Sequence, residues 1–153
     1  MCIEHTGDGA TPATELRQPF QVVLVGLEEH LATELAWALR ECAAAEVRII
    51  PCEGAEEWLA EWSHGPLSPA DAIFCAASAS FYRRILGARH RRSTPVIVVS
   101  PYEDHAGWLE ALEAGAHDYC APPFEKRQIG WILAGLRAIA EAAPVAHGSL
   151  AGR

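Results

Sequence analysis

Two stretches of the sequence, TPVIVVSPYED (Thr94–Asp104) and EAGAHDYCAPPF (Glu113–Phe124), decide the fold. The first contains a short, continuous apolar run between polar residues, a pattern typical of a strand buried on both faces. The second begins as the end of a helix that stops at Gly115, a residue type that favours helix termination, and then enters another apolar segment. Together they predict a buried strand, a helix and a second strand in sequence.

The same alternation extends over most of the chain. The expected strands are residues 21–26, 46–51, 71–76, 93–100 and 116–122. The expected helices are residues 28–45, 54–65, 80–90, 103–115 and 124–143. Strands that alternate with helices form a parallel sheet covered on both faces and joined by right-handed crossovers. The sequence therefore predicts an α/β protein with a doubly wound, five-stranded parallel sheet.

Helical spacing also predicts which side chains face the core. These are Leu31, Leu35, Leu39 and Cys42 in the first helix, Trp58, Leu59 and Trp62 in the second, and Ile129, Ile132, Leu133, Leu136 and Ile139 in the last. We expect one domain over residues 20–142. Residues 1–19 lack any period, and we expect a flexible lead-in there. From Pro144 the pattern weakens, so residues 143–153 are expected to be a flexible tail or a truncated linker.

The composition is that of a folded chain without a membrane span. Half of its 153 residues are hydrophobic, and five are tryptophan, which is enough for one sizeable core. No window approaches the roughly 18 apolar residues that a span needs, and residues 1–19 lack the basic and apolar regions of a signal peptide. We expect a cytoplasmic protein with no membrane partner.

The cysteines and histidines give no sign of a metal or redox site. The five cysteines are scattered without a C-x-x-C pair, and the seven histidines show no metal-ligand spacing with them. We expect reduced, structural thiols, no metal and no cofactor.

The charge is unevenly distributed along the chain. Residues 1–80 contain 13 acids and 3 bases, whereas residues 81–153 contain 7 acids and 9 bases. Five bases lie in the segment Arg83–Arg92. A basic cluster can bind nucleic acid, but aromatic residues are few around this one and the whole chain is acidic. A solvated helix face is the favoured interpretation, and nucleic acid is not expected as a partner.

In its second half the chain resembles the receiver domain of two-component response regulators. Receivers typically have a fourth strand that ends in Thr or Ser, a helix that ends in Ala-Gly-Ala, an aromatic fifth strand and then Lys-Pro-Phe. This order matches the two stretches quoted above, and the likeness extends over roughly residues 21–142. It implies a flavodoxin-like, CheY-like fold with strand order 2-1-3-4-5.

The resemblance also implies where a phosphorylation site would lie. A working receiver has two acids after strand one that help to bind Mg²⁺, an Asp at the end of strand three that accepts the phosphoryl group, and a Lys after strand five. A carboxylate nucleophile needs this cationic support to attack phosphorus.

Most of these groups are missing here. The acidic pair falls on Leu27 and Glu28, although a shift of one residue would give Glu28 and Glu29. The phospho-acceptor falls on Ala76, and the Lys falls on Pro122. Ser100 matches the Thr or Ser of strand four. We expect a degenerate receiver, a pseudo-receiver without a catalytic residue or a metal site.

Ser78 and Ser80 follow the missing acceptor. A serine without a neighbouring general base is a poor nucleophile, so we do not expect either to replace the Asp.

Three further features follow from the resemblance. Tyr119 falls where receivers carry an aromatic residue that switches between inward and outward states, although a core position is the favoured interpretation. The peptide bond between Pro122 and Pro123 is expected to be cis. The face made by the fourth helix, fifth strand and fifth helix is the usual docking and dimerisation surface of receivers, and here it carries Trp108, Tyr119 and Trp131.

Two classes of function remain open. The first is a signalling module that acts by contact with another signalling protein or with itself, with any effector domain outside this chain. The alternative is a small-molecule sensor with its ligand in the remodelled pocket bounded by Leu27, Ala76, Ser100 and Pro122. An enzyme is not expected, because no nucleophile and base fall together at the strand ends.

Overall fold

The computed structural model describes residues 20–42, 45–65, 70–89 and 94–151, including side chains except those of residues 89 and 140–151. The expected lead-in at residues 1–19 lies outside these ranges. The strands are β1 (Phe20–Val25), β2 (Ala45–Ile50), β3 (Ala72–Ala76), β4 (Val96–Val99) and β5 (Asp118–Cys120). The helices are α2 (Glu29–Cys42), η1 (Cys52–Gly54), α3 (Ala55–His64), α4 (Ala79–Arg89), α5 (His105–Ala114) and α6 (Lys126–Ala151).

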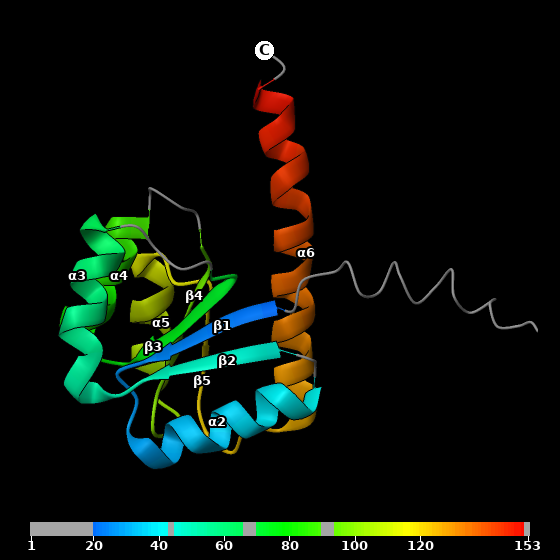
Figure 1. Ribbon diagram of the computed structural model, residues 1–153. Helices are drawn as coiled ribbons and strands as arrows, with labels where there is room; N and C mark the ends of the chain where they lie inside the picture. Colours follow the sequence, from blue (N-terminus) through cyan, green and yellow to red (C-terminus); the bar gives the residue numbers. More distant parts are fainter. Residues whose placement is uncertain (1–19, 43–44, 66–69, 90–93, 152–153) are drawn as a thin grey trace, which may run out of the picture.

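The five strands form one parallel sheet in the order β2-β1-β3-β4-β5 (Figure 1). This arrangement confirms the predicted fold class and strand order. β3 and β4 consist of apolar residues, all of them buried except the partly buried Ala76, since both faces of these strands are covered. β2 is an edge strand, and its burial alternates instead of being continuous.

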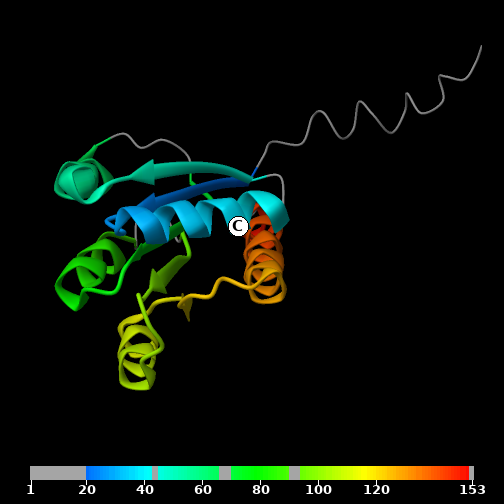
Figure 2. The ribbon, with the colours of Figure 1, turned by 90° about the horizontal axis from the view of Figure 1, so that it is seen from below.

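Helices cover both faces of the sheet (Figures 1 and 2). α2 and α6 pack on one face, where Leu35 and Leu136 belong to the same core cluster as Leu24 of β1. α3, α4 and α5 pack on the other face, where Trp58 and Ile85 join a second cluster. The sheet therefore separates two hydrophobic cores.

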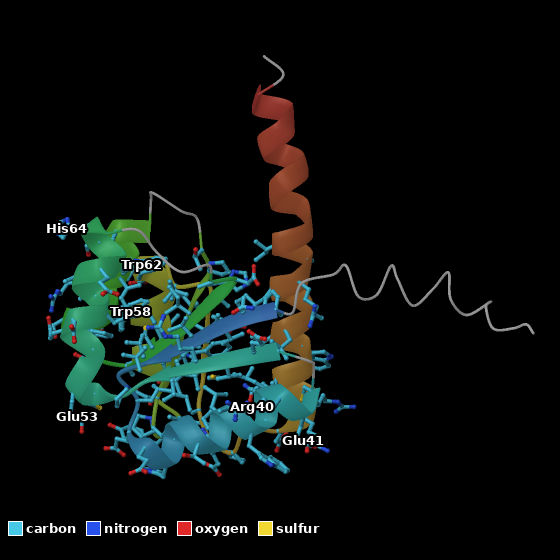
Figure 3. All side chains as sticks on the ribbon, viewed as in Figure 1. Arg40, Glu41, Glu53, Trp58, Trp62 and His64 are labelled. Atoms are coloured by element: carbon cyan, nitrogen blue, oxygen red, sulfur yellow. The ribbon has the colours of Figure 1, made fainter. Side chains whose placement is uncertain are left out.

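The apolar stripes predicted from helical spacing face these cores. In α3 the rings of Trp58 and Trp62 stack with their centroids 5.5 Å apart, and Trp62 Nε1 donates to the carbonyl oxygen of Ile85. Figure 3 shows both rings on the inner side of α3. The outermost stripe residues, Cys42 and Ile139, are only partly buried.

The last helix is longer than the sequence indicates. α6 does not end at residue 143 but continues through Pro144 to Ala151, and its last turns extend beyond the sheet (Figure 1). Alanine, the strongest helix former, is frequent in this segment, and the missing N–H of Pro144 does not break the backbone helix. The expected tail is thus helical up to Ala151, whereas its role as a linker stays a prediction.

No helix among the described residues is both long and apolar enough to cross a membrane.

Two substitutions in α2 should differ sharply in their effect on stability. Leu35 is 0% exposed, so Leu35→Ala leaves a cavity and should lower the free energy of unfolding by about 2–5 kcal/mol. Trp37 is 62% exposed, so Trp37→Ala should change it by less than about 1 kcal/mol. Urea unfolding followed by circular dichroism measures both. Equal losses would contradict the described orientation of α2.

Candidate functional site

The positions expected to form a phosphorylation pocket lie together at the carboxyl edge of the sheet. Ala76 is the last residue of β3 and pairs with Val99 of β4. Ser100 and Pro122 follow β4 and β5, and Leu27 follows β1. The sequence therefore located this edge correctly, and its chemistry depends on the side chains present there.

The end of β1 is closely packed against small apolar groups. Gly26 has a φ of 78°, a conformation that favours glycine, and its N–H donates to the carbonyl oxygen of Ile50 (3.0 Å). A Cβ at this position would lie 3.5 Å from the ring of Phe81 and 3.8 Å from the Cβ atoms of Ala55 and Ala76. Gly26 therefore lies among apolar side chains, one of which is Ala76.

The first two pocket positions supply little negative charge. Leu27 is 4% exposed and belongs to the core cluster beneath α2. The carboxylate of Glu28 lies 3.6 Å from His30 Nδ1, and both side chains are largely exposed. One solvated carboxylate thus remains where a receiver has two acids.

Ser78 and Ser80 follow β3 at the start of α4. Their hydroxyl oxygens lie 3.1 Å apart, and the Ser78 carbonyl oxygen accepts the first helical hydrogen bonds, from Phe81 and Tyr82. Neither hydroxyl contacts a histidine or carboxylate among the described residues, so no general base activates them.

The hydroxyl of Ser100 hydrogen-bonds to the backbone of the turn that follows β4. Ser100 is 3% exposed, and its Oγ donates to the carbonyl oxygen of Tyr102 while accepting from the Tyr102 N–H. The hydroxyl satisfies backbone groups at the strand end, which is the ordinary structural role of a serine in such a turn.

The cation of the receiver site is also absent from this edge. Pro122 carries no charge, and the peptide bond between Pro122 and Pro123 is cis, as the sequence predicts. Lys126 is the single lysine of the sequence, and its Nζ lies 3.2 Å from Glu41 in the last turn of α2. Glu41 lies about 18 Å along the axis of α2 from Glu29, the first residue of that helix.

These residues do not fit a divalent cation or a transferred phosphoryl group. Among the described residues, no three His, Cys, Asp or Glu side chains are grouped so that they could hold a metal ion. Burial raises the pKa of the Cys75 thiol next to Ala76, and raises that of Cys120 to about 12. Neither cysteine is therefore a thiolate nucleophile near neutral pH.

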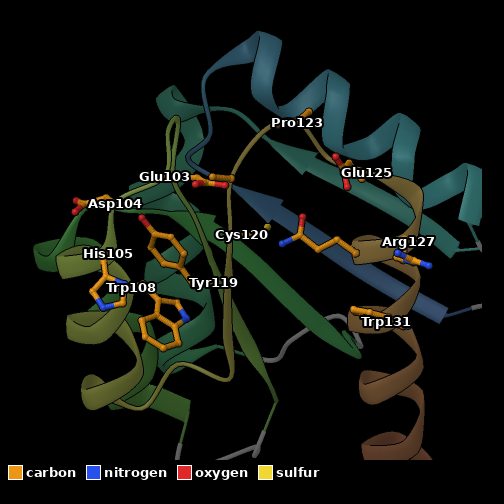
Figure 4. Close-up of a pocket in the computed structure, with 12 residues that line it drawn as sticks. Glu103, Asp104, His105, Trp108, Tyr119, Cys120, Pro123, Glu125, Arg127 and Trp131 are labelled. Carbon is orange, nitrogen blue, oxygen red and sulfur yellow. The ribbon is translucent and has the colours of Figure 1, made fainter.

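A groove lies on a different face, between α5 and α6 over β5 (Figure 4). It has a volume of about 560 Å³ and is lined by all three of the predicted interface residues, Trp108, Tyr119 and Trp131. By contrast, neither this groove nor two further hollows along α2 are lined by Ala76, Ser100 or Pro122. Leu27, the fourth position of the predicted ligand pocket, lines one of the hollows along α2, and ligand binding at this edge stays a prediction.

The three aromatic residues of the groove differ in exposure. Trp131 is 70% exposed on α6, with the guanidinium of Arg127 5.7 Å from its ring centroid. Trp108 is half-buried on α5, and its ring lies 5.2 Å from that of His105. Tyr119 is half-buried at the edge of the second core. Figure 4 shows Trp108 and Tyr119 on one side of the groove and Trp131 on the other.

Polar groups surround these rings. Three carboxylates, of Glu103, Asp104 and Glu125, line the groove, together with Arg127. This combination of exposed aromatic rings with a polar rim is typical of protein-binding surfaces. Arg127 and His105 were not identified from the sequence, because their roles depend on which helix faces meet across β5.

The start of α5 positions Tyr119. Asp104 caps the helix by accepting from the Gly107 N–H. A Cβ at position 107 would lie 2.8 Å from Asp104 Oδ2 and 3.4 Å from Tyr119 Oη. Glycine at this position therefore allows the capping carboxylate and the tyrosine hydroxyl to approach the same turn.

Part of the basic segment Arg83–Arg92 is neutralised. Arg83 lies 3.2 Å from Glu110, and Arg84 makes two hydrogen bonds to Glu56. Residues 90–93 lie outside the described part of the chain. The described arginines thus belong to a solvated, ion-paired helix face, as the sequence analysis favours.

Comparison with known proteins places the fold. No protein-family model and no curated protein match the sequence. The response regulatory domain of protein mrkE from Klebsiella pneumoniae is 21% identical with a TM-score of 0.62, over 80% of this chain and 99% of that chain. A putative response regulator from Chloroflexus aurantiacus is 21% identical with a TM-score of 0.61, over 79% of this chain and 99% of that chain. The BeF3-activated DrrB receiver domain is 17% identical with a TM-score of 0.60, over 79% of this chain and 99% of that chain.

These structures are receiver domains, and the chain described above has their fold. The agreement covers the CheY-like sheet and its helices, which confirms the fold that the resemblance implies.

Gly107→Ala and Gly135→Ala should have opposite effects on stability. Both positions are helical, and Ala normally stabilises a helix by about 0.5–1 kcal/mol relative to Gly. A Cβ at position 135 meets nothing within 4 Å, so that variant should gain this amount. At position 107 the new methyl group displaces the capping carboxylate, so we expect a net loss of about 1 kcal/mol.

Thermal unfolding at fixed pH measures both variants. A stabilised Gly107→Ala protein would mean that the capping carboxylate does not occupy the described position.

Proposed function

We propose that this chain is a pseudo-receiver, a non-enzymatic signalling module with a receiver fold that does not accept a phosphoryl group and acts by protein–protein contact. The observation that carries the proposal is the groove over β5, with Trp131 70% exposed across from Trp108 and Tyr119. Tryptophan is enriched at binding hot spots, because its large ring buries much apolar area when a partner covers it.

The side chains at the carboxyl edge of the sheet support the proposal that this chain is not phosphorylated there. Attack on phosphorus needs a nucleophile, a divalent cation and positive charge at the developing oxyanions. Ala76 and Pro122 provide none of these, and Leu27 is part of the core. Any response-regulator role of this chain therefore has to work without phosphorylation at the carboxyl edge of the sheet.

In this proposal, Tyr119 is the residue through which binding in the groove affects the rest of the domain. In a working receiver the serine or threonine of strand four responds to the phosphoryl group, but the hydroxyl of Ser100 already bonds to Tyr102. The position of Tyr119 would then be set by whatever occupies the groove, since its hydroxyl lies beside the first turn of α5.

The occupant of the groove is a second copy of the chain or another signalling protein. An effector domain on a separate chain, or outside this sequence, would receive the signal. A cytoplasmic location is part of the same proposal.

Photocrosslinking tests the groove directly. Benzoylphenylalanine at position 131 keeps an aromatic ring at the rim, and the same residue at position 134, exposed on the same helix but outside the groove lining, is the matched control. In cells that naturally produce the chain, we expect a covalent protein adduct from position 131 and little from position 134.

The mass of the adduct distinguishes a second copy from another protein. Equal crosslinking from both positions would show that the groove is not the docking site.

A further inference from the structure

A second surface lies along the outer side of α2, away from the groove. One hollow of about 630 Å³ is lined by residues that include Glu34 and Trp37. Another of about 460 Å³ includes Ile49 and Glu53. Both hollows share Glu29 and Thr33, so they form one continuous surface between α2, the end of β2 and η1. We call the residues lining these two hollows the α2 surface.

The α2 surface contains large apolar groups that the protein itself does not cover. Trp37 is 62% exposed and Ile49 is 40% exposed. Within the described residues, Trp37 makes no hydrogen bond and no ring contact, in contrast to Trp58 and Trp62, which stack in the core. Ile49 faces α2 from an edge strand, beyond which no further strand pairs.

Carboxylates surround these apolar groups. Glu29, Glu34 and Glu53 line the surface, and no lysine or arginine does. In the described part of the chain none of the three carboxylates forms an ion pair. Figure 3 shows Glu53 above the start of α2, while Arg40 and Glu41 lie at the opposite end of the helix. Arg40 donates to the carbonyl oxygen of Val47 and forms no ion pair with these three acids.

The sign of this charge restricts what can bind. Nucleic acid and anionic lipid surfaces would be repelled, because their phosphates meet unpaired carboxylates. Two copies of the chain facing each other through this surface would place like charges together. Residues 1–19 contain three acids and one base, so they have the same sign. The complementary occupant is a basic segment of another protein that also carries apolar side chains.

We propose that the α2 surface is a docking site for a basic, amphipathic segment of a partner protein. Apolar side chains of the segment cover Trp37 and Ile49, and its lysines or arginines lie against Glu29, Glu34 and Glu53. A guanidinium or ammonium group also binds favourably to an indole face. The site is separate from the groove over β5, so the chain can hold two proteins at once. This inference does not depend on the loss of phosphorylation.

The test uses the full, isotope-labelled chain and a synthetic peptide of leucine and lysine with leucines at i, i+3, i+4 and i+7 spacing. A second peptide with every lysine replaced by glutamate controls for charge. Two-dimensional NMR follows the backbone amides and the five tryptophan indoles, with the Trp37 indole assigned from Trp37→Phe.

We expect the lysine peptide to shift the Trp37 indole and the amides of Glu29, Thr33 and Glu34 saturably, and the glutamate peptide to leave them in place. Trp37→Ala should weaken binding by roughly tenfold, as for an aromatic anchor. Glu34→Gln should weaken it by roughly twofold to fivefold and reduce its dependence on salt.

Trp131→Ala, in the other groove, is the matched control and should leave the binding unchanged. The proposal is overturned if no saturable shift occurs at Trp37, if Trp37→Ala binds like the original chain, or if both peptides bind equally. Shifts centred on Trp108 and Trp131 instead would also overturn it, while supporting the groove over β5 as a docking site.

Discussion

The parallel sheet directs the ends of all five strands to one edge, and the chemistry of that edge depends on whether charged groups converge there. Among the described residues, no three His, Cys, Asp or Glu side chains gather there to hold a metal ion. The turn after β1 packs Gly26 against Phe81 and Ala76, and Leu27 is drawn into the core beneath α2. Burying an unpaired charge among such groups would be costly. The packing that closes this edge is therefore compatible with apolar side chains at Leu27 and Ala76.

The lysine that a receiver carries at the carboxyl edge of the sheet has no counterpart at Pro122, and the lysine of this sequence lies elsewhere. Lys126, the single lysine, pairs with Glu41 between α6 and α2. That contact joins the first and last helices on the same face of the sheet. An exposed pair of this kind adds little stability, but it holds the ammonium group far from the strand ends.

Two surface regions of the described residues offer places for interaction, the groove over β5 and the α2 surface. The groove over β5 has aromatic residues on both sides and charges of both signs, whereas the α2 surface has one exposed tryptophan and is lined by three carboxylates but by no lysine or arginine. This difference in charge favours different partners. Under the proposed function, the chain would act by bringing proteins together.

The sequence predicted the fold well because its strands are short apolar runs and its helices have clear apolar stripes. The resemblance to receivers also predicted that Trp108, Tyr119 and Trp131 share a face, and all three line the groove over β5. The exposed position of Trp37 could have been inferred, because Trp37 lies between Leu35 and Leu39 and off their stripe.

Other features could not be read from periodicity. Gly107 matters because of contacts made by Asp104 and Tyr119 in space. The cation over Trp131 depends on the rotamer of Arg127. The predicted end of α6 was wrong: Pro144 suggested that the helix stops there, but the alanine-rich segment continues as a helix to Ala151.

The central claim is that the edge at Ala76 cannot bind a phosphoryl group. The most direct measurement is an amide NMR titration with Mg²⁺ and beryllofluoride, a mimic of the aspartyl phosphate, with a receiver domain that retains its Asp as the positive control. The account predicts that the amides of Ala76, Ser100 and Tyr119 stay in place while those of the control move. Saturable shifts at Ala76 and Ser100 would contradict it.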